Sequence, residues 1–245
     1  MGHMTDSISL EPQRCLIQLS GPDTLTLLER LVTNNTQDWN EGERRYGALL
    51  TPQGKVIADY EALRTAGGVD LNVAAVAAED LAKRLKMFRL RADVQIDIGE
   101  EAPALYRDEA GRIMAGRPIQ GVDFGSAEIF PSDINMDRLG GVALNKGCFV
   151  GQEVVSRMHR RGNIRRRTVV LLGENLEAGG DVRAGGNSLG QVTSVDQKCA
   201  LARLRIDRLA RAEADGLALS VNDIPVTVEK SDWLQEEMAS FLKDD

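Results

Sequence analysis

The sequence predicts an α+β fold followed by a small C-terminal β-barrel, and three observations support this. Strand patterns and amphipathic helix patterns are interleaved over residues 15–98, which is typical of α+β domains. Glycine and proline interrupt residues 111–147, and short strand patterns separated by turn residues follow an arginine-rich run. The 245 residues also exceed the roughly 100 to 200 residues usual for one domain, which favours two domains.

The first region begins with a strand that ends at Gly21-Pro22. In the second predicted helix, Leu81, Leu85 and Phe88 recur at i, i+4 and i+7 and would share one face. The order of proline and glycine in Thr51-Pro52-Gln53-Gly54 suits a tight turn between two strands. The predicted elements are strands over 15–19, 46–50, 56–63, 69–76 and 94–98, and helices over 25–32 and 79–88.

The second region is predicted to be a barrel. Residues 111–147 give a weaker signal, and we expect irregular chain that lines a cleft. We place the domain boundary near Arg165, with residues 5–165 as an α+β region and 166–245 as the barrel domain. Its predicted strands are 168–172, 188–195, 200–204, 217–221 and 224–228, and residues 233–242 are predicted as a closing helix.

The chain has too few histidines for most histidine-based catalytic or metal sites. Residues 1–4, Met-Gly-His-Met, resemble a cloning remnant ahead of a second start, so we leave them out of the fold. His159 is then the single remaining histidine, and it lies in an arginine-rich run. A Ser-His-Asp triad and a histidine-rich metal site are therefore not expected.

Composition predicts a cytoplasmic protein with reduced thiols. The three cysteines lie far apart with no C-x-x-C pair, which argues against a disulfide scaffold and against a complete metal site. No apolar stretch approaches the ~20 residues needed to span a bilayer, and no targeting segment is evident, so we expect no membrane partner. Phosphate-loop and dinucleotide-binding fingerprints are also missing from the sequence.

The net charge of −7 argues against a surface that binds nucleic acid throughout. One exception is a cluster of six arginines between Arg157 and Arg167, which could bind an anionic ligand or partner. An RNA contact is an alternative, but no stacking aromatic residues are interleaved with these arginines, so we do not expect direct nucleic-acid binding.

The segment Lys146-Gly147-Cys148-Phe149-Val150-Gly151-Gln152-Glu153 is the strongest candidate for function. Lys146 lies two residues before Cys148, and a nearby ammonium favours thiolate over thiol. The glycines would let the backbone approach a ligand closely. The residue types fit equally well a turn that enters a helix, with a small buried cysteine.

This octapeptide resembles the K-G-C-[YF]-x-G-Q-E signature of YgfZ-type folate-binding proteins. Leu19–Asp23 with Thr33–Asn35 is similar to the opening L-x-G-x-D…T-N-D segment of that family, with Asn35 in place of aspartate. Leu50–Asp59 resembles its L-x-P-Q-G-[KR]-x-x-x-D segment. Pro131–Met136 resembles its P-x-E-x-x-[LM] step, with the shorter Asp133 in place of glutamate, which would weaken or re-aim a carboxylate contact to a pterin.

The resemblance implies a ring-shaped fold of ferredoxin-like α/β units, shared with the aminomethyltransferases of glycine cleavage, with tetrahydrofolate or a derivative in a central opening. A carboxylate accepts the N–H edge of a pterin, so Asp133 is the first candidate and Asp59 the second. Phe149 and Phe130 could stack on a flat ring, and Arg157 or Arg165 could pair with the anionic glutamate tail. The plain structural alternatives are a turn cap for Asp59, a core position for Phe149 and a solvated linker for the arginines. The remaining candidates around the folate are Gln53, Asn34, Gln152 and Glu153.

The family also implies a function: support of iron-sulfur enzymes, including tRNA-modifying ones, with Cys148 and Lys146 as candidate catalytic residues. One cysteine cannot hold a cluster, which ordinarily needs about four ligands, so we expect no stably bound metal and partners among client enzymes or assembly proteins. The alternative is a folate-dependent one-carbon transferase. Aminomethyltransferases usually lack the cysteine and the Gln-Glu pair that follows it, which separates the two hypotheses. Whether the protein turns over a substrate, what Cys148 does, and the oligomeric state stay open.

Overall fold

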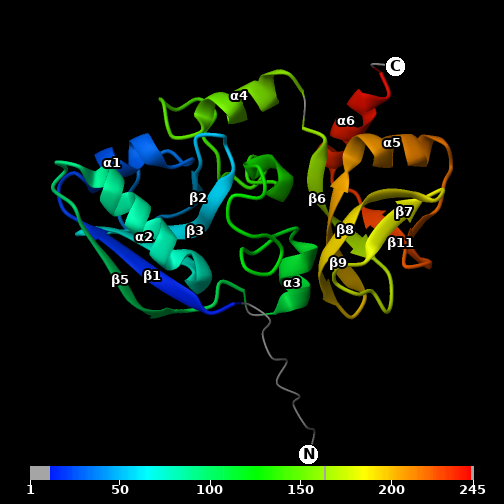
Figure 1. The fold of residues 1–245 in the computed structure, drawn as a ribbon, viewed down its shortest axis with the longest axis horizontal. Coiled ribbons are helices and arrows are strands. Elements are labelled where there is room, and N and C mark those ends of the chain that lie inside the picture. Colours follow the sequence, from blue (N-terminus) through cyan, green and yellow to red (C-terminus); the bar gives the residue numbers. More distant parts are fainter. Residues whose placement is uncertain (1–11, 107, 163, 244–245) are drawn as a thin grey trace, which may run out of the picture. The chain divides into compact units, whose positions relative to one another are not determined.

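The computed structural model describes residues 12–106, 108–162 and 164–243, which divide into two compact units (Figure 1). The sheet unit consists of Gln13–Pro103 and Ile119–Arg167. The barrel unit contains Ala104–Pro118 and the residues from Thr168 onward. The chain therefore leaves the sheet unit after residue 103, returns to it at residue 119, and leaves it again after residue 167.

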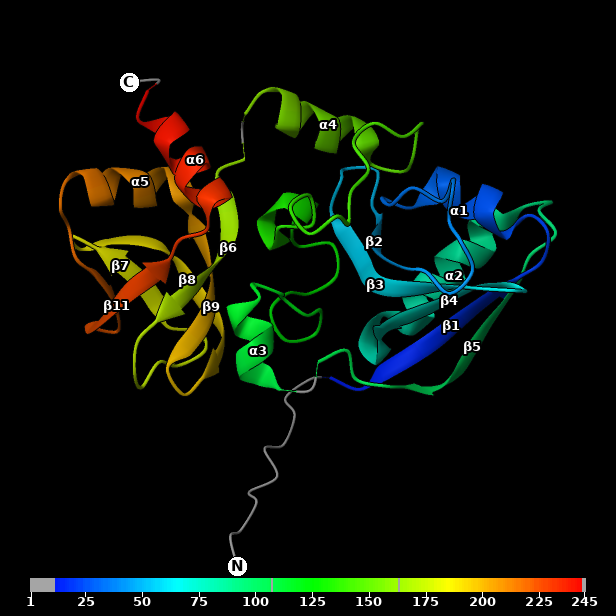
Figure 2. The ribbon, with the colours of Figure 1, turned by 180° about the vertical axis from the view of Figure 1, so that it is seen from behind.

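The sheet unit is built on a five-stranded antiparallel sheet with the order β2-β3-β4-β1-β5. Side chains alternate between its faces, as strand geometry requires. Figure 2 shows the strands side by side from behind. Their bounds are β1 Arg14–Ser20, β2 Arg44–Leu50, β3 Val56–Thr65, β4 Gly68–Ala74 and β5 Gln95–Ala102.

Two helices, α1 (Thr24–Leu31) and α2 (Ala75–Arg89), share one apolar core with the sheet. In α1 and α2, Leu28, Leu81 and Leu85 are buried, and they belong to the same cluster as strand residues such as Ile17 and Leu71. One face of the sheet is therefore dry and closed by helices.

The opposite face of β2 and β3 carries a second core. Ala48, Leu50 and Val56 pack there with residues from the segment 124–155. That segment contains the 3-10 turn η1 (Pro131–Ile134) and the helix α4 (Gln152–Arg160). Its buried apolar members are Phe124, Ile129, Ile134, Met136, Val142, Phe149 and Val155.

The β2–β3 turn and the start of α4 touch closely. Gly151 has φ +80°, and a Cβ at this position would lie 2.6 Å from the carbonyl oxygen of Thr51 and 3.0 Å from the Cα of Gly54. Gly54 also has φ +80° and faces Val154. The two glycines let the end of the signature segment pack on the turn.

The barrel unit closes six strands in the order β10-β11-β6-β9-β8-β7. Two helices, α5 (Ile206–Ala214) and α6 (Asp232–Phe241), pack together beside it (Figures 1 and 2). Ile206, Leu209 and Leu234 of these helices join the barrel core. The strands are β6 Arg166–Leu172, β7 Asp181–Ala184, β8 Asn187–Asp196, β9 Cys199–Arg205, β10 Leu219–Val221 and β11 Ile224–Glu229.

A short helix, α3 (Glu109–Met114), explains why Ala104–Pro118 belongs with the barrel. Ile113 packs against Val170, Cys199 and Leu201 of β6 and β9. The neighbouring Arg112 is buried, and its guanidinium donates to the carbonyl oxygen of Arg117 (2.7 Å) and to Oγ of Ser194 (2.8 Å).

The α+β fold with a C-terminal barrel is confirmed, while several elements differ from their prediction. The strand predicted over 69–76 ends at Ala74, because α2 begins at Ala75. The predicted irregular chain over 111–147 includes most of α3, whose N-cap Asp108 accepts from the backbone N–H of Gly111. The prediction also lacks β7, α4 and α5; of these, α4 buries only Val155 and so shows little apolar periodicity. The predicted domain scheme places 104–118 with the sheet region, whereas these residues group with the barrel.

We expect Gly151→Ala to destabilise the chain by roughly 2 to 4 kcal/mol, because it adds a backbone clash to the cost of a left-handed non-glycine residue. Gly162→Ala is the matched control: Gly162 also has positive φ (+61°), but nothing lies within 4 Å of its added Cβ. Its expected cost is about 1 kcal/mol. Urea unfolding of both variants measures the difference, and equal losses would contradict the close contact.

Candidate functional site

The candidate site centres on the thiol of Cys148, in the loop before α4. Of the three cysteines, Cys148 alone is exposed, while Cys15 is half-buried and Cys199 is buried. Burial raises the pKa of the Cys15 thiol, and burial followed by the charges of Asp196 and Glu109 raises the pKa of Cys199. Reactivity and ligation both require an accessible sulfur, so Cys148 is the thiol that a partner can reach.

Lys146 anchors this loop. Its side chain is only 1% exposed, and Nζ donates to the carbonyl oxygens of Val32 (2.9 Å) and Asn34 (2.7 Å). Glu29 of α1 forms an ion pair with it at 3.4 Å. Burial lowers the pKa of Lys146, and Glu29 opposes this shift. The hydrogen bonds and the ion pair of the ammonium are thus with oxygens of residues 29–34, rather than with the thiol that the sequence pattern suggested.

Thr33 ties the same segment to β2. Its hydroxyl accepts from the backbone N–H of Ala48 (2.9 Å) and donates to the carbonyl oxygen of Gly141 (2.6 Å). Backbone bonds from Thr33 N to Ala48 O (3.0 Å) and from Ala143 N to Thr33 O (2.9 Å) extend this connection. The T-N-N segment and the signature loop are therefore held together by residues 33 and 146.

The glutamine and glutamate of the signature have different surroundings. Gln152 begins α4, and its Nε2 donates to the carbonyl oxygen of Lys146 at 3.1 Å, which closes the loop around Cys148. The side chain of Glu153 is exposed and lies 3.5 Å from Arg157, one turn along α4. Gln152 therefore shapes the loop, whereas Glu153 faces solvent.

A buried carboxylate lies on the sheet face opposite the helices. Asp59 of β3 is 6% exposed, and its Oδ2 accepts from the hydroxyl of Tyr46 at 3.0 Å. Its backbone N–H donates to Oε1 of Gln120, whose Nε2 in turn donates to the carbonyl oxygen of Ile57. Gly141 lies against the Tyr46 ring, because a Cβ at Gly141 would be 2.7 Å from Cδ1 of that ring.

Asp133 is also 6% exposed, and it caps its own turn. Its Oδ2 accepts from the backbone N–H of Phe130 at 2.9 Å, at the start of η1. Asn135 ends the turn in the left-handed region, with φ +58°, and Met136 enters the core beside β2. The shorter carboxylate thus caps a turn, a role that the sequence suggests as an alternative for Asp59 and not for Asp133.

The aromatic and turn candidates are differently placed. Phe149 is buried in the core between β2, β3 and α4, and Nζ of Lys146 lies 5.4 Å from the centre of its ring. Phe130 is half-buried, and Nζ of Lys55 lies 3.6 Å from its ring centre. Gln53 is exposed at the β2–β3 turn.

Asn34 lies on the other side of the sheet from Asp59. It is buried, and its Oδ1 accepts from the hydroxyl of Tyr60 at 2.8 Å. Burial raises the pKa of Tyr60 well above its usual value, so the hydroxyl remains a donor. Tyr60 belongs to the helix-side core, and neighbouring residues of a strand face opposite ways. Within the described residues, Nδ2 of Asn34 has no hydrogen-bond partner.

The arginine run divides into exposed and buried members. Arg165 is exposed and Arg157 has a half-exposed side chain, so both can reach an anion in solvent. Arg167 is fully buried, and its guanidinium donates to both carboxylate oxygens of Asp137 (2.6 and 2.9 Å). Nε2 of His159 lies 3.6 Å from the same carboxylate. Arg167 therefore fixes the end of the sheet unit.

Sequence reasoning missed the residues that position the candidates. Thr33, Tyr46 and Gln120 contact them across long stretches of chain, and Glu29 reaches Lys146 from α1. Only the register of β2 on β3 brings Tyr46 near Asp59. A glutamate one helical turn before Thr33 was visible, but nothing in the sequence paired it with residue 146.

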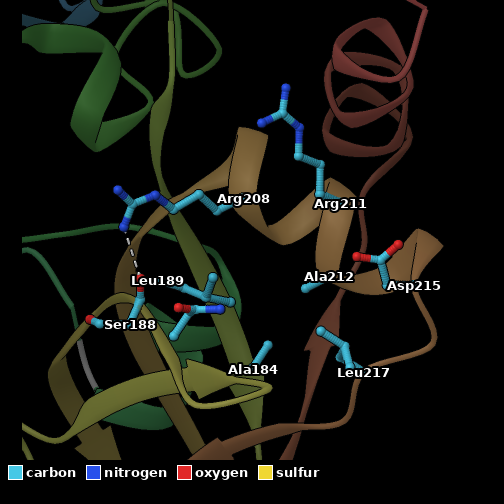
Figure 3. A pocket seen from close by; sticks show the side chains of 9 residues that line it. Ala184, Ser188, Leu189, Arg208, Arg211, Ala212, Asp215 and Leu217 are labelled. Atoms are coloured by element: carbon cyan, nitrogen blue, oxygen red, sulfur yellow. Dashed lines mark hydrogen bonds between the residues drawn. The ribbon is translucent and has the colours of Figure 1, made fainter. Parts of the chain in front are cut away.

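A separate pocket of about 430 Å³ lies between α5 and the β7–β8 hairpin of the barrel unit (Figure 3). Arg208 reaches across it and donates to the carbonyl oxygen of Ser188 at 3.0 Å, whereas the side chain of Arg211 points away from Ser188 and Leu217. None of the predicted site residues lines this pocket.

Among the described residues, no cluster of three or more histidine, cysteine, aspartate or glutamate side chains could hold a metal ion. The same part of the chain contains no helix with the length and apolar character needed to cross a membrane.

Comparison with known proteins supports the fold. A family described as the C-terminal beta-barrel domain of CAF17 matches residues 165–236. The crystal structure of the glycine cleavage system aminomethyltransferase T from Bartonella henselae is similar with a TM-score of 0.70, over 90% of this chain and 84% of that one. The two share 15% sequence identity, so this likeness shows the aminomethyltransferase-like fold alone.

The relatives in sequence are named iron-sulfur cluster assembly factor IBA57 homologues. The one from Pyricularia oryzae is 29% identical over 211 residues, which cover 63% of this chain and 54% of the relative. The one from Mycosarcoma maydis is 25% identical over 223 residues, covering 65% and 55%. The chain thus spans about half the length of the curated relatives it matches.

The names of these relatives correct one prediction. All of them are described as mitochondrial, which contradicts the cytoplasmic location predicted from the sequence. That prediction was wrong because unpaired cysteines and the lack of an evident targeting pattern do not identify a compartment.

The ion pair between Glu29 and Lys146 predicts a pH dependence of stability. Burial would raise the pKa of Glu29, but hydrogen bonds from Thr36 and the charge of Lys146 outweigh it and lower the pKa below its usual 4.5. The carboxylate ionises more readily in the folded chain, so its contribution is present above about pH 4.5 and is lost as the pH falls through the folded-state pKa.

We therefore expect Glu29→Gln to lower the urea midpoint at pH 7 and to reduce the loss of stability as the pH falls from about 4.5 through the folded-state pKa of Glu29. Glu153→Gln is the control, because exposed ion pairs contribute at most about 1 kcal/mol. Identical acid limbs for wild type and Glu29→Gln would contradict the assignment.

Proposed function

We propose that this protein is an accessory factor for iron-sulfur cluster assembly or repair, in which Cys148 contacts the cluster or a thiol of the partner that carries it. The observation that carries this proposal is the exposed sulfur on a loop that is anchored on both sides. Lys146 anchors the start of the loop through hydrogen bonds to the carbonyl oxygens of Val32 and Asn34. Gly151 packs the end of the loop on the β2–β3 turn. The names of the sequence relatives support the same function.

The chain would act with a partner rather than alone. Clusters ordinarily need about four ligands, and the described residues contain no group of three or more histidine, cysteine, aspartate or glutamate side chains that could hold a metal. A thiolate on a rigid loop can supply one ligand at low conformational cost, while the partner supplies the others. Client enzymes that modify tRNA belong to this proposal through the family resemblance alone.

A reduced folate is the second part of the proposal. When bound, it would supply a one-carbon carrier and a flat pterin ring. Asp59 fits the polar edge of a pterin, since its buried carboxylate has Tyr46 on one oxygen and stands beside an apolar core. Asp133 also fits as an acceptor, although one oxygen caps η1. The exposed Arg157 and Arg165 would pair with the carboxylates of the tail.

Four other candidates support this folate proposal less directly. Phe149 is a core residue, and a face of Phe130 is next to Lys55. Asn34 lies on the helix side of β3, and Gln53 lies at the exposed turn. Asp59 is therefore the residue on which we would test folate binding first.

The one-carbon transferase alternative has no specific support. The likeness to an aminomethyltransferase is one of fold, and the Cys148 loop is the feature that the resemblance to YgfZ-type proteins adds.

Replacing Cys148 tests the assembly function. In cells that lack this protein, we expect wild type and Cys15→Ser to restore the activity of iron-sulfur enzymes, and Cys148→Ser to restore little of it, because Cys148 is exposed whereas Cys15 is half-buried. Protein levels and urea midpoints of the variants should match. Full rescue by Cys148→Ser would refute the proposed role of the thiol.

Folate binding is tested separately with purified protein. Tetrahydrofolate should bind wild type and Asp97→Asn, a control on exposed β5 surface, and should bind Asp59→Asn about tenfold or more weakly, as expected for loss of a charge-assisted hydrogen bond. Calorimetry gives the three affinities. If tetrahydrofolate does not bind wild type, the folate part of the proposal is refuted, and the cysteine-dependent assembly function is unaffected.

A further inference from the structure

A groove on the sheet unit lies between α1 and the end of α2. Its lining residues belong to segments 23–31 and 88–92 and do not include the Cys148 loop. It has a volume of about 850 Å³, within the range of ligand-sized clefts. Leu27 and Leu31 of α1 form an apolar floor, and the half-exposed Phe88 of α2 forms a wall. The other lining residues are Asp23, Thr26, Arg30, Arg89, Leu90, Arg91 and Ala92.

Leu90 at the rim combines two unfavourable features. It is 85% exposed, and it adopts φ +49° and ψ −107° immediately after α2. Helices commonly end on glycine in the left-handed region, because a side chain there is strained. Within the described residues, an exposed leucine at such a position gains no burial to offset the strain. Strain and exposed apolar surface together are typical of a binding site.

The turn itself does not require leucine. The chain reverses through backbone bonds from Ala92 N to Arg89 O (2.9 Å) and from Val94 N to Ala92 O (3.0 Å), and the guanidinium of Arg89 donates to the carbonyl oxygen of Val94. These bonds involve backbone atoms or Arg89, so glycine at position 90 would preserve them.

The rim of the groove is positively charged in an acidic chain. Arg30, Arg89 and Arg91 line it, against the single carboxylate of Asp23. The side chains of Arg30 and Arg91 have no ion-pair or hydrogen-bond partner among the residues that the structure describes. The net charge of the chain is −7, so the groove carries a local excess of cations in an acidic chain.

We propose that this groove binds an acidic segment of a partner protein that inserts apolar side chains. Carboxylates of the segment would pair with Arg30 and Arg91, and its apolar side chains would cover Leu90 and Phe88 and reach the floor at Leu27. A protein segment suits the site better than a membrane surface, because the apolar floor is recessed below the rim and only inserted side chains can reach it.

The test starts with peptide selection on the full-length chain. Displayed random peptides are selected on wild type and counter-selected on a Leu90→Gly, Arg91→Ser double variant. The enriched peptides should be acidic with apolar anchors. If none is enriched, or if those enriched are basic or purely polar, the proposal is overturned.

The affinities of one enriched peptide for single variants then show which residues of the groove bind it. Fluorescence anisotropy should show at least about tenfold weaker binding for Leu90→Gly and for Arg91→Ser, and unchanged binding for Lys83→Ser, an exposed cation of α2 outside the groove. Added salt should weaken the binding. The thermal midpoint of Leu90→Gly should be unchanged or higher, which separates lost binding from misfolding. Equal affinity of Leu90→Gly and wild type would overturn the proposal.

Two further measurements separate other occupants. Co-sedimentation with phosphatidylglycerol vesicles measures binding to a membrane. If substitution of Leu90 and Arg91 reduces this binding more than it reduces peptide binding, the groove is assigned to a membrane. Light scattering that shows a dimer abolished by Leu90→Gly would assign it to a second copy of this chain. Either result would overturn the proposed partner segment.

Discussion

A single buried ammonium determines how the signature loop is arranged. Removing a charge from water costs several kcal/mol unless it is paired and hydrogen-bonded, so Lys146 can remain buried only while the carbonyl oxygens of Val32 and Asn34 and the carboxylate of Glu29 surround it. These partners fix the segment after α1 against the loop before α4. The thiol two residues later gains a fixed position from this arrangement. Its chemistry would then depend on what approaches from solvent.

The five-stranded sheet of the sheet unit has two different faces. One is closed by α1 and α2 over a dry core, and Asn34 is directed to this side through Tyr60. The other carries an apolar floor interrupted by the buried carboxylate of Asp59, with Tyr46 and Gln120 around it. A polar, selective surface next to an apolar one is what recognition of a flat heteroaromatic ligand requires. The division follows from the alternation of side chains along β3.

Local patterns predicted the fold well because most elements carry their own signal. Leucines at helical spacing gave α1 and α2, and Thr51–Gly54 gave the hairpin of β2 and β3. Helix α4 was not predicted because it buries only Val155, and α3 was not predicted because it is short and contains Gly111. The candidate site was harder to predict. The sequence identified Cys148, but it linked Lys146 to the thiol when its contacts lie with residues 29–34, which are more than a hundred residues away.

The excursion of Ala104–Pro118 into the barrel unit has a consequence for synthesis on the ribosome. The sheet unit is complete once Arg167 has emerged, whereas Ile113 must wait for Val170, Cys199 and Leu201 before its side chain is covered. During that interval a helix with an apolar face is tethered to a folded neighbour and exposed to aggregation. Neither unit can be cut out as one continuous stretch. A fragment that starts at Thr168 would lack α3 and leave the surface of β6 and β9 bare, which shapes how truncated forms of this chain should be designed.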